Sequence, residues 1–556
     1  MYLRETRRTN KDGRVVRYLQ LAHNERHPKS GAATARIIHN FGRTDQVDRA
    51  GLERLIGSIS RVLDPTAAMT SSAGEDVDVL DTRNLGGAWV LDQLWRRLRI
   101  DASMRQLLDG RRLDPRVERV LFALVANRAL DPLSKLATTQ WVGERVAISG
   151  LDAVDEDTCY RAMDWLLEIE DELAQAVYWA VADLLDLEVD LLFFDTTSTY
   201  FESDGDDVSA EDGERTIGFR TFGHSKDSRA DLPQVVIGMA VTRTGIPIRV
   251  WTWPGNTNDS ALIREVRDDL RAWKLSRVVW VADRGFTSAE NRRYLQRAGG
   301  HYILGEKLRG ESAEAAAALA RPGRFHTVAA NLRVKEVVID DGTMRDRFVI
   351  CHNPEQAERD RAVRQALVRQ LELVIADTDA LAADKREEAA CRLHAKPALR
   401  KWLRITAGGR LRIDQAKVRA EERFDGKFLL RTSDPTLSAE DVALGYKQLL
   451  EVERGWRDMK STLDLRPVFH RKEERIRSHV LLCWLALLLI RIAENATQDT
   501  WRNLRNELDR MHRVTLATSH GQVTQRTLTN ARQGAILAAL DLPEPPRYFE
   551  FTLPAS

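Results

Sequence analysis

Two apolar runs that each lead into an aspartate constrain the fold of this chain more than any other feature. The run 191–194 leads into Asp195, and the run 278–282 leads into Asp283. Short apolar runs of this kind are typical of strands buried in a sheet. A carboxylate that follows several apolar residues is costly to bury unless it is paired or binds a metal ion. The pattern therefore predicts a buried sheet with acidic side chains at neighbouring strand ends.

The order of the expected elements after residue 189 indicates an α/β fold with a ribonuclease-H-like core, a mixed β-sheet with flanking helices. Strands are expected at 189–201, 234–243, 247–253, 277–283 and 301–305, and helices at 259–273 and 287–299. Three strands followed by helix, strand, helix and strand is the order of that core. A helix at about 438–463 would complete it after an interruption, and an apolar helix is expected at 474–496.

A third acidic residue, Glu453, lies in a segment with helical periodicity. Tyr446, Glu453 and Lys460 are seven residues apart, which is close to two helical turns, so they are expected on one face. Alone, the segment is more typical of a surface helix in which Glu453 and Arg457 form an i,i+4 pair. Together with two strand-end aspartates, it indicates a site for two divalent ions, Mg²⁺ or Mn²⁺, that acts on phosphodiesters.

A polar loop at 223–234 contains further charged candidates. Its acids Asp227 and Asp231 compete with the strand-end aspartate as metal ligands. Their position in a loop favours another role, as supports for Lys226 and Arg229, which could hold DNA phosphates. Three tryptophans could stack on an unpaired base, but core packing fits each better: Trp251, Trp253 and Trp456.

The length of 556 residues is too great for one core and predicts several domains. We expect a small basic β-rich domain with a meander at 1–64, a linker at 65–76 and a helical DNA-binding domain at 77–186. The core is expected at 187–309 and 438–500, and a C-terminal region at 501–556. The insertion at 310–437 should contain strands and then a long helix at 355–396. The net charge is only +1, yet ten Lys and Arg stand against four Asp and Glu in 1–45, and ten against three in 391–424. Such local basic stretches can contact phosphates, although each alone is as typical of a solvated surface.

The four cysteines are scattered, which indicates neither a disulfide framework nor a zinc site and favours a reducing cytosol. The longest apolar run, 480–490, is too short to span a bilayer and predicts a buried helix. No N-terminal segment has the pattern of a signal peptide. We therefore expect a cytoplasmic protein that has no membrane partner.

Several segments resemble the DDE transposases of bacterial insertion sequences, in the insertion-sequence-four superfamily. They are FFDTTSTYFE at 193–202, GHSKDSRADLPQ at 223–234, PGNTND at 254–259, VADRGF at 281–286 and YKQLLEVERGWRDMKSTLDLRPVFH at 446–470. The last segment aligns with that group's Tyr-(2)-Arg-(3)-Glu-(6)-Lys pattern. The chain departs from the pattern at the arginine, where it has Leu449, and Arg454 or Arg457 could take over the phosphate contact.

The resemblance implies that the protein moves a DNA element by cutting its ends and joining them to target DNA. Asp195, Asp283 and Glu453 would bind two Mg²⁺ or Mn²⁺ ions. Double-stranded DNA, both inverted-repeat ends and target, would contact Tyr446, Lys460, Arg457, Lys226, Arg229 and Arg284. The resemblance further implies a homodimer on paired ends and a location at the bacterial nucleoid. Two alternatives remain open: a two-metal nuclease without strand transfer, and a non-catalytic DNA-binding protein derived from a transposase.

Overall fold

The chain forms two compact units. The computed structural model describes residues 1–552 except 12–13, 27–32, 64–76, 186–190, 204, 212–213, 272, 274–277, 310–311, 341–344, 467, 469 and 519–520. The first unit consists of Met1–Thr82, Arg513–Thr527 and Pro546–Ser556, and the second of Arg83–His512 and Leu528–Pro545. The linker expected at 65–76 lies outside the described residues.

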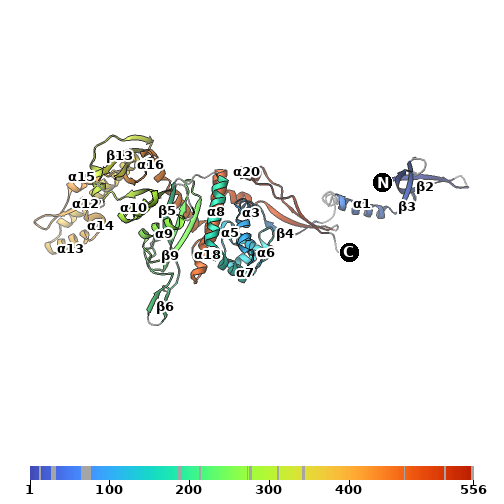
Figure 1. Ribbon diagram of the computed structural model, residues 1–556, viewed down its shortest axis with the longest axis horizontal. Helices are drawn as coiled ribbons and strands as arrows, with labels where there is room; N and C mark the ends of the chain where they lie inside the picture. The colour runs from blue at the N-terminus through green and yellow to red at the C-terminus, as the bar shows by residue number, and fades with distance from the viewer. Residues whose placement is uncertain are drawn as a thin grey trace. The chain divides into compact units, whose positions relative to one another are not determined.

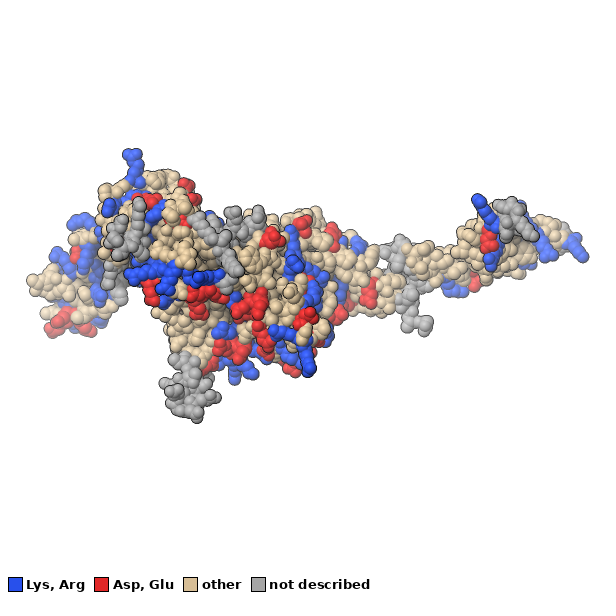
Figure 2. Space-filling model, viewed as in Figure 1, with Lys and Arg blue, Asp and Glu red and all other residues tan. Residues whose placement is uncertain are grey.

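The described residues of the first unit form two sheets and one helix. Strands β1 (Tyr2–Thr9), β2 (Val15–Arg26) and β3 (Ala33–Arg43) form the expected antiparallel meander, and helix α1 (Arg49–Leu63) follows (Figure 1). The second sheet has the order β20-β19-β18-β4 and contains β4 (Asp78–Asn84), β18 (His512–Thr518), β19 (Gly521–Arg526) and β20 (Tyr548–Thr552). Strand β4 was not expected, because its partner strands come from the far end of the chain. On the face shown in Figure 2, Lys and Arg side chains project from the β1–β3 sheet.

The second unit begins with six helices that share a hydrophobic core with the sheet that follows. They are α3 (Gly86–Arg97), α4 (Ile100–Leu108), α5 (Val117–Leu130), α6 (Lys135–Glu144), α7 (Glu156–Glu168) and α8 (Glu170–Leu185). Two of these helices have a side-chain N-cap. The Ser134 side chain accepts a hydrogen bond from a backbone N–H of α6, and the Asp155 side chain accepts one from a backbone N–H of α7. Helices α5 and α7 pack against α18 (Glu473–Thr497), which in turn packs against strand β9 of the sheet. One continuous core therefore joins the helical region to the sheet.

A nine-stranded mixed sheet forms the centre of the second unit, with the order β12-β13-β14-β17-β11-β10-β5-β8-β9. Its expected strands are present: β5 (Leu191–Tyr200), β8 (Gln234–Val241), β9 (Pro247–Pro254), β10 (Val279–Ala282) and β11 (His301–Glu306). Strands β5, β10 and β11 are parallel, whereas β5, β8 and β9 are antiparallel. Helix α9 (Asp259–Arg271) precedes β10, and α10 (Ala289–Leu295) precedes β11, as the sequence predicts. A hairpin of β6 (Val208–Glu211) and β7 (Glu214–Ile217) follows β5.

Residues 310–437 contribute four more strands to that sheet. These are β12 (His326–Ala329), β13 (Leu332–Asp340), β14 (Arg345–His352) and β17 (Lys427–Thr432). Helix α11 (Ala313–Ala320) precedes β12. The segment between β14 and β17 contains six elements: α12 (Pro354–Asp379), α13 (Ala383–His394), α14 (Pro397–Arg400), β15 (Leu403–Ile405), β16 (Leu411–Ile413) and α15 (Gln415–Glu422). The single long helix expected at 355–396 is therefore wrong. The chain breaks after α12, so that Leu393 of α13 can pack with Leu371 and Trp402 in a small apolar cluster.

The expected helix at about 438–463 is also two helices, α16 (Ala439–Lys447) and α17 (Leu450–Ser461). Backbone hydrogen bonds between residues three apart tighten the chain at Gln448 and Leu449 and end the α-helical phase. The apolar helix expected at 474–496 is α18, which is buried over most of its length. By length and composition alone α18 could cross a membrane, but 94% of its apolar window is buried, as in a core helix. Helices α19 (Trp501–Leu508) and α20 (Ala531–Ala539) follow.

Candidate active site

Two aspartates lie next to each other at the ends of adjacent parallel strands. Asp195 belongs to β5, and Asp283 directly follows β10. Ala282 pairs with Phe194 in the register of the two strands, so that the next residue on each strand is an aspartate. Neighbouring strands are about 4.8 Å apart, and residues at the same level of parallel strands point to the same side. The apolar runs of the sequence therefore bring these two acids together.

The surroundings of Asp195 are rich in negative charge. Burial is the main cause that raises the pKa of Asp195 to about 6; Lys226 and a hydrogen bond from the backbone of Thr196 lower it, and the charges of Asp283 and Asp259 raise it. Carboxylates that repel one another in a partly buried place gain most from a bound cation. The chemistry of this donor set therefore fits a divalent metal ion.

Tyr446 holds the second aspartate. Its hydroxyl donates a hydrogen bond of 3.0 Å to Asp283 Oδ1. Burial, and then the charge of Asp283, raises the pKa of Tyr446 above its usual range. The tyrosine lies on α16, whereas Glu453 lies on α17, so the prediction that both share one face of a single helix is wrong. Gly305 makes room for the ring, since a Cβ at that position would collide with the tyrosine hydroxyl.

Glu453 lies in the first turn of α17 and is exposed. Its charge is the smallest of the causes that act on the pKa of Tyr446, and it raises that pKa. In the described part of the chain, no three His, Cys, Asp or Glu side chains converge closely enough to hold a metal ion. The meeting of Asp195, Asp283 and Glu453 around two ions therefore stays a prediction.

Lys226 of the polar loop lies against the first aspartate's strand. Its ammonium donates to the backbone oxygen of Thr196 at 2.5 Å and to the Thr196 hydroxyl at 2.6 Å. It also pairs with Asp259 at 3.0 Å, and the Thr196 hydroxyl donates to the same carboxylate at 2.9 Å. The sequence reasoning missed Asp259, although this residue ends the segment PGNTND at 254–259 that carries part of the resemblance.

Lys460 of α17 forms an ion pair with the same loop. Its ammonium pairs with Asp227 at 2.9 Å, and Arg466 pairs with the other oxygen of that carboxylate at 2.7 Å. Asp227 was expected to support Lys226, and this expectation is wrong because Asp227 points to α17 instead. The Lys460 and Asp227 side chains are each 12% exposed, so this ion pair also fastens the loop. Arg466 comes from an irregular segment after α17, and the sequence has no pattern that indicates its role.

The other cations expected to contact DNA are accessible to different extents. Arg229 pairs with Asp231 at 2.9 Å, as expected, and lies over the ring of Tyr200. Arg284 and Arg457 are exposed, and neither side chain forms an ion pair or hydrogen bond among the described residues. These two arginines are therefore the cations of this site that a DNA phosphate can reach without displacing a carboxylate.

A leucine, Leu449, stands where the family pattern has an arginine. Leu449 is buried in the core, so it has no access to DNA. Arg454 pairs with Glu494 at 2.9 Å and lies 3.8 Å from Glu451. Of the two residues that could replace the arginine, Arg457 is therefore the one whose side chain has no carboxylate partner among the described residues. The three tryptophans are buried, as core packing predicts: Trp251, Trp253 and Trp456.

Two family models assign the chain to one class of protein. A family model described as a transposase DDE domain matches residues 204–489, which is more than half of the chain, and a model described as the N-terminal domain of IS1634 family transposases matches residues 3–69. The first match includes Asp283 and Glu453 and begins shortly after Asp195. No curated protein matches the chain. Among solved structures, a piggyBac transposase in a synaptic complex with hairpin DNA aligns over 76% of each chain at 11% identity, with a TM-score of 0.34 that is too low to support an argument.

Proposed function

The chain belongs to the DDE transposases, and from this premise we propose that Asp195, Asp283 and Glu453 are the acids that hold its catalytic metal ions. The protein is an enzyme that cleaves DNA and transfers the cleaved strand in DNA transposition. The observation that carries the proposal is the register of β5 and β10, which sets two aspartates side by side on parallel strands. The order of strands and helices around them supports a ribonuclease-H-like core.

The residues around the acids have separate tasks in the proposed site. Two Mg²⁺ or Mn²⁺ ions, when bound, would activate a water or a 3′-hydroxyl group and stabilise the leaving oxygen. The Tyr446 hydroxyl orients Asp283 by its hydrogen bond to Oδ1, which leaves Oδ2 to bind a metal ion. Arg284 and Arg457 are free to hold the phosphates that flank the cleaved bond.

The substrate is DNA, and we propose its form from the distribution of charge. The basic β1–β3 sheet would bind the inverted-repeat ends of the element, and the basic residues of 391–424 would assist with end or target DNA. Two copies of the chain would hold two ends, as a homodimer at the bacterial nucleoid. The match of residues 3–69 to a transposase N-terminal domain supports a DNA-end role for the β1–β3 sheet.

The test is a set of single substitutions in the full-length protein with a linear duplex that carries the element ends. Asp195→Asn, Asp283→Asn and Glu453→Gln should each reduce cleavage and strand transfer by orders of magnitude, because each removes a metal ligand. End binding in a gel-shift assay should persist. As a control, Asp152→Asn replaces an exposed acid of the helical region and should cleave like the parent protein. Normal cleavage by Asp195→Asn would move the first acid elsewhere, with Asp259 as the neighbouring candidate.

A further inference from the structure

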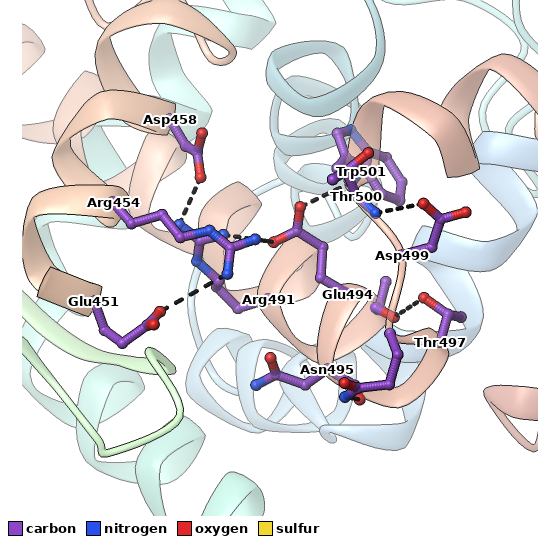
Figure 3. Close-up of polar contacts among 12 residues, drawn as sticks. Glu451, Arg454, Asp458, Arg491, Glu494, Asn495, Thr497, Asp499, Thr500 and Trp501 are labelled. Atoms are coloured by element: carbon purple, nitrogen blue, oxygen red, sulfur yellow. Dashed lines mark hydrogen bonds and ion pairs between the residues drawn. The ribbon is translucent and has the colours of Figure 1, made fainter. Parts of the chain in front are cut away.

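Helix α17 carries the third acid, and a partly buried ionic network fastens this helix to α18. The Arg491 side chain of α18 is completely buried. Its Nη2 donates to Asp458 of α17 at 2.5 Å, and its Nη1 donates to Glu494 of its own helix at 2.5 Å (Figure 3). One arginine therefore joins the two helices through two carboxylates.

Glu494 is the second centre of this network. It accepts a hydrogen bond from Arg454 of α17 at 2.9 Å, and its other oxygen accepts one of 2.8 Å from the backbone nitrogen of Trp501, at the start of α19. Figure 3 shows the Arg454 and Arg491 side chains converging on this carboxylate from α17 and α18. The backbone contact to α19 fixes Glu494 itself, so the network has a rigid anchor.

The network and the proposed metal ligand occupy different faces of α17. With about 100° per residue in an α-helix, positions 451, 454 and 458 form one face, which points to α18. Glu453, Arg457 and Lys460 form another face, about 125° away by the same geometry. A contact on the first face therefore controls the rotation of the second face about the helix axis.

Rotation of α17 would move the acid substantially. The end of a long side chain lies about 6 Å from the helix axis, so a rotation of about 20° moves it by about 2 Å. An error of about 1 Å in a catalytic group can cost about 10²-fold in rate. The turn at 448–449 leaves α17 only 12 residues long, so the helix depends on its packing for its orientation. An ion pair of this kind is a weak source of stability compared with apolar packing, so its directional hydrogen bonds are the more important property here.

We propose that Arg491 is a positioning residue that sets the rotation of α17, through Asp458, so that Glu453 meets the two aspartates around the metal ions. Glu494 holds the arginine in place and ties it to Arg454. This inference rests on the proposed function, because it takes Glu453 to be a metal ligand. Mg²⁺ demands near-ideal octahedral geometry, so a small rotation should appear first as weaker metal binding.

The test measures metal binding directly in the full-length protein with a duplex end. Asp458→Asn keeps the shape of the side chain, removes the charge on α17 and leaves the Arg491–Glu494 pair intact. Arg491→Met removes the joining charge itself, and Arg491→Lys keeps the charge with fewer donors. We expect Mn²⁺ binding, followed by electron paramagnetic resonance, to weaken about ten-fold in Asp458→Asn and more in Arg491→Met, as for other residues that orient metal ligands. Arg491→Lys should recover part of the loss, and the Mg²⁺ concentration for half-maximal cleavage should rise in parallel.

Two controls separate this role from general stability and from the proposed function. Arg477→Met removes another arginine of α18, which pairs with Glu473 of the same helix, and it should leave Mn²⁺ affinity unchanged. Normal Mn²⁺ affinity in folded Asp458→Asn and Arg491→Met would overturn the inference, and Asp458→Asn alone decides if Arg491→Met does not fold. Glu453→Gln distinguishes the two failures. If it loses Mn²⁺ binding while Asp458→Asn does not, only the positioning role fails, whereas normal binding in Glu453→Gln refutes the ligand assignment.

Discussion

At the scale of single residues, the hydrogen bond from Tyr446 to Asp283 links the late part of the chain to the sheet. The hydroxyl is partly buried, and Gly305 gives it the space it occupies. A ligand that is oriented by a partner loses less freedom when a metal ion binds, so the tyrosine should matter for chemistry more than for DNA affinity.

We expect Tyr446→Phe to reduce cleavage roughly ten-fold, because residues that orient metal ligands are worth about 10–100-fold. End binding without metal should not change. Tyr294→Phe is a matched control, since the Tyr294 hydroxyl also donates to an aspartate, Asp268, outside the site. Single-turnover cleavage of an end duplex measures both. A Tyr446→Phe protein that cleaves at the parent rate would show that Asp283 needs no such support.

A second residue-scale prediction concerns a lysine in the helical region. Lys135 is only 5% exposed, and burial, together with the charge of Arg128, lowers its pKa from 10.5 to about 7. Between these two pH values the unfolded chain binds the proton and the folded chain does not, so the stability of the fold rises with pH through this range. Below pH 7 both states are protonated, and the full cost of the buried charge remains.

Lys135→Met should therefore stabilise the protein at pH 7, on the order of 2–4 kcal/mol. The gain should shrink as the pH approaches 10. Thermal unfolding at pH 7 and pH 9.5 measures the change, with Lys385→Met as the control because Lys385 is exposed on α13. Equal gains at both pH values would mean that Lys135 carries no buried charge at pH 7.

At the scale of secondary structure, the elements that local periodicity defines were predictable, and those that depend on distant partners were not. Strands β5, β8, β9, β10 and β11 lie where apolar runs and alternation place them. The sequence from 438 to 463 has continuous helical periodicity, yet the chain turns at 448–449. That turn lets Tyr446 reach Asp283 while Val452 and Met459 stay in the core, which is a tertiary demand that periodicity does not report.

The same distinction between local signals and distant partners applies to the residues of the candidate site. The two strand-end aspartates could be found, because an acid after an apolar run is a local signal. The acidic partners of Lys460 and Lys226 could not be found in the sequence. Asp227 and Asp259 reach these lysines from segments whose path the sequence does not specify.

At the scale of the whole molecule, the helical region and the sheet form one unit. Helices α5 and α7 pack on α18, which the chain reaches only after the sheet is complete. A fragment that ends at residue 186 would expose the apolar face that α18 covers, so it is a poor test of DNA binding. Substitutions in the full-length protein are the better test.

We expect Arg8→Gln combined with Lys11→Gln to weaken end binding and to lower the slope of log K against log salt concentration by about 2, since each lost phosphate contact removes about one released counterion. Both residues are exposed in the β1–β3 region. Binding titrations at several salt concentrations give the slope. Arg404→Gln with Arg410→Gln, two exposed arginines of the β15–β16 hairpin, is the comparison. A slope that changes only in this second protein would move end recognition to residues 310–437.

The place of β17 in the central sheet has a consequence for biosynthesis. This strand pairs with β11 on one side and β14 on the other, but it follows β11 by about 120 residues. At roughly 5–20 residues per second, a ribosome needs roughly 6–24 s to supply it, and until then β11 has an open edge that other chains can join. Glu453 emerges later still. A chain released before β17 is made would contain both aspartates without the glutamate, and we expect it to aggregate through the open edge of β11.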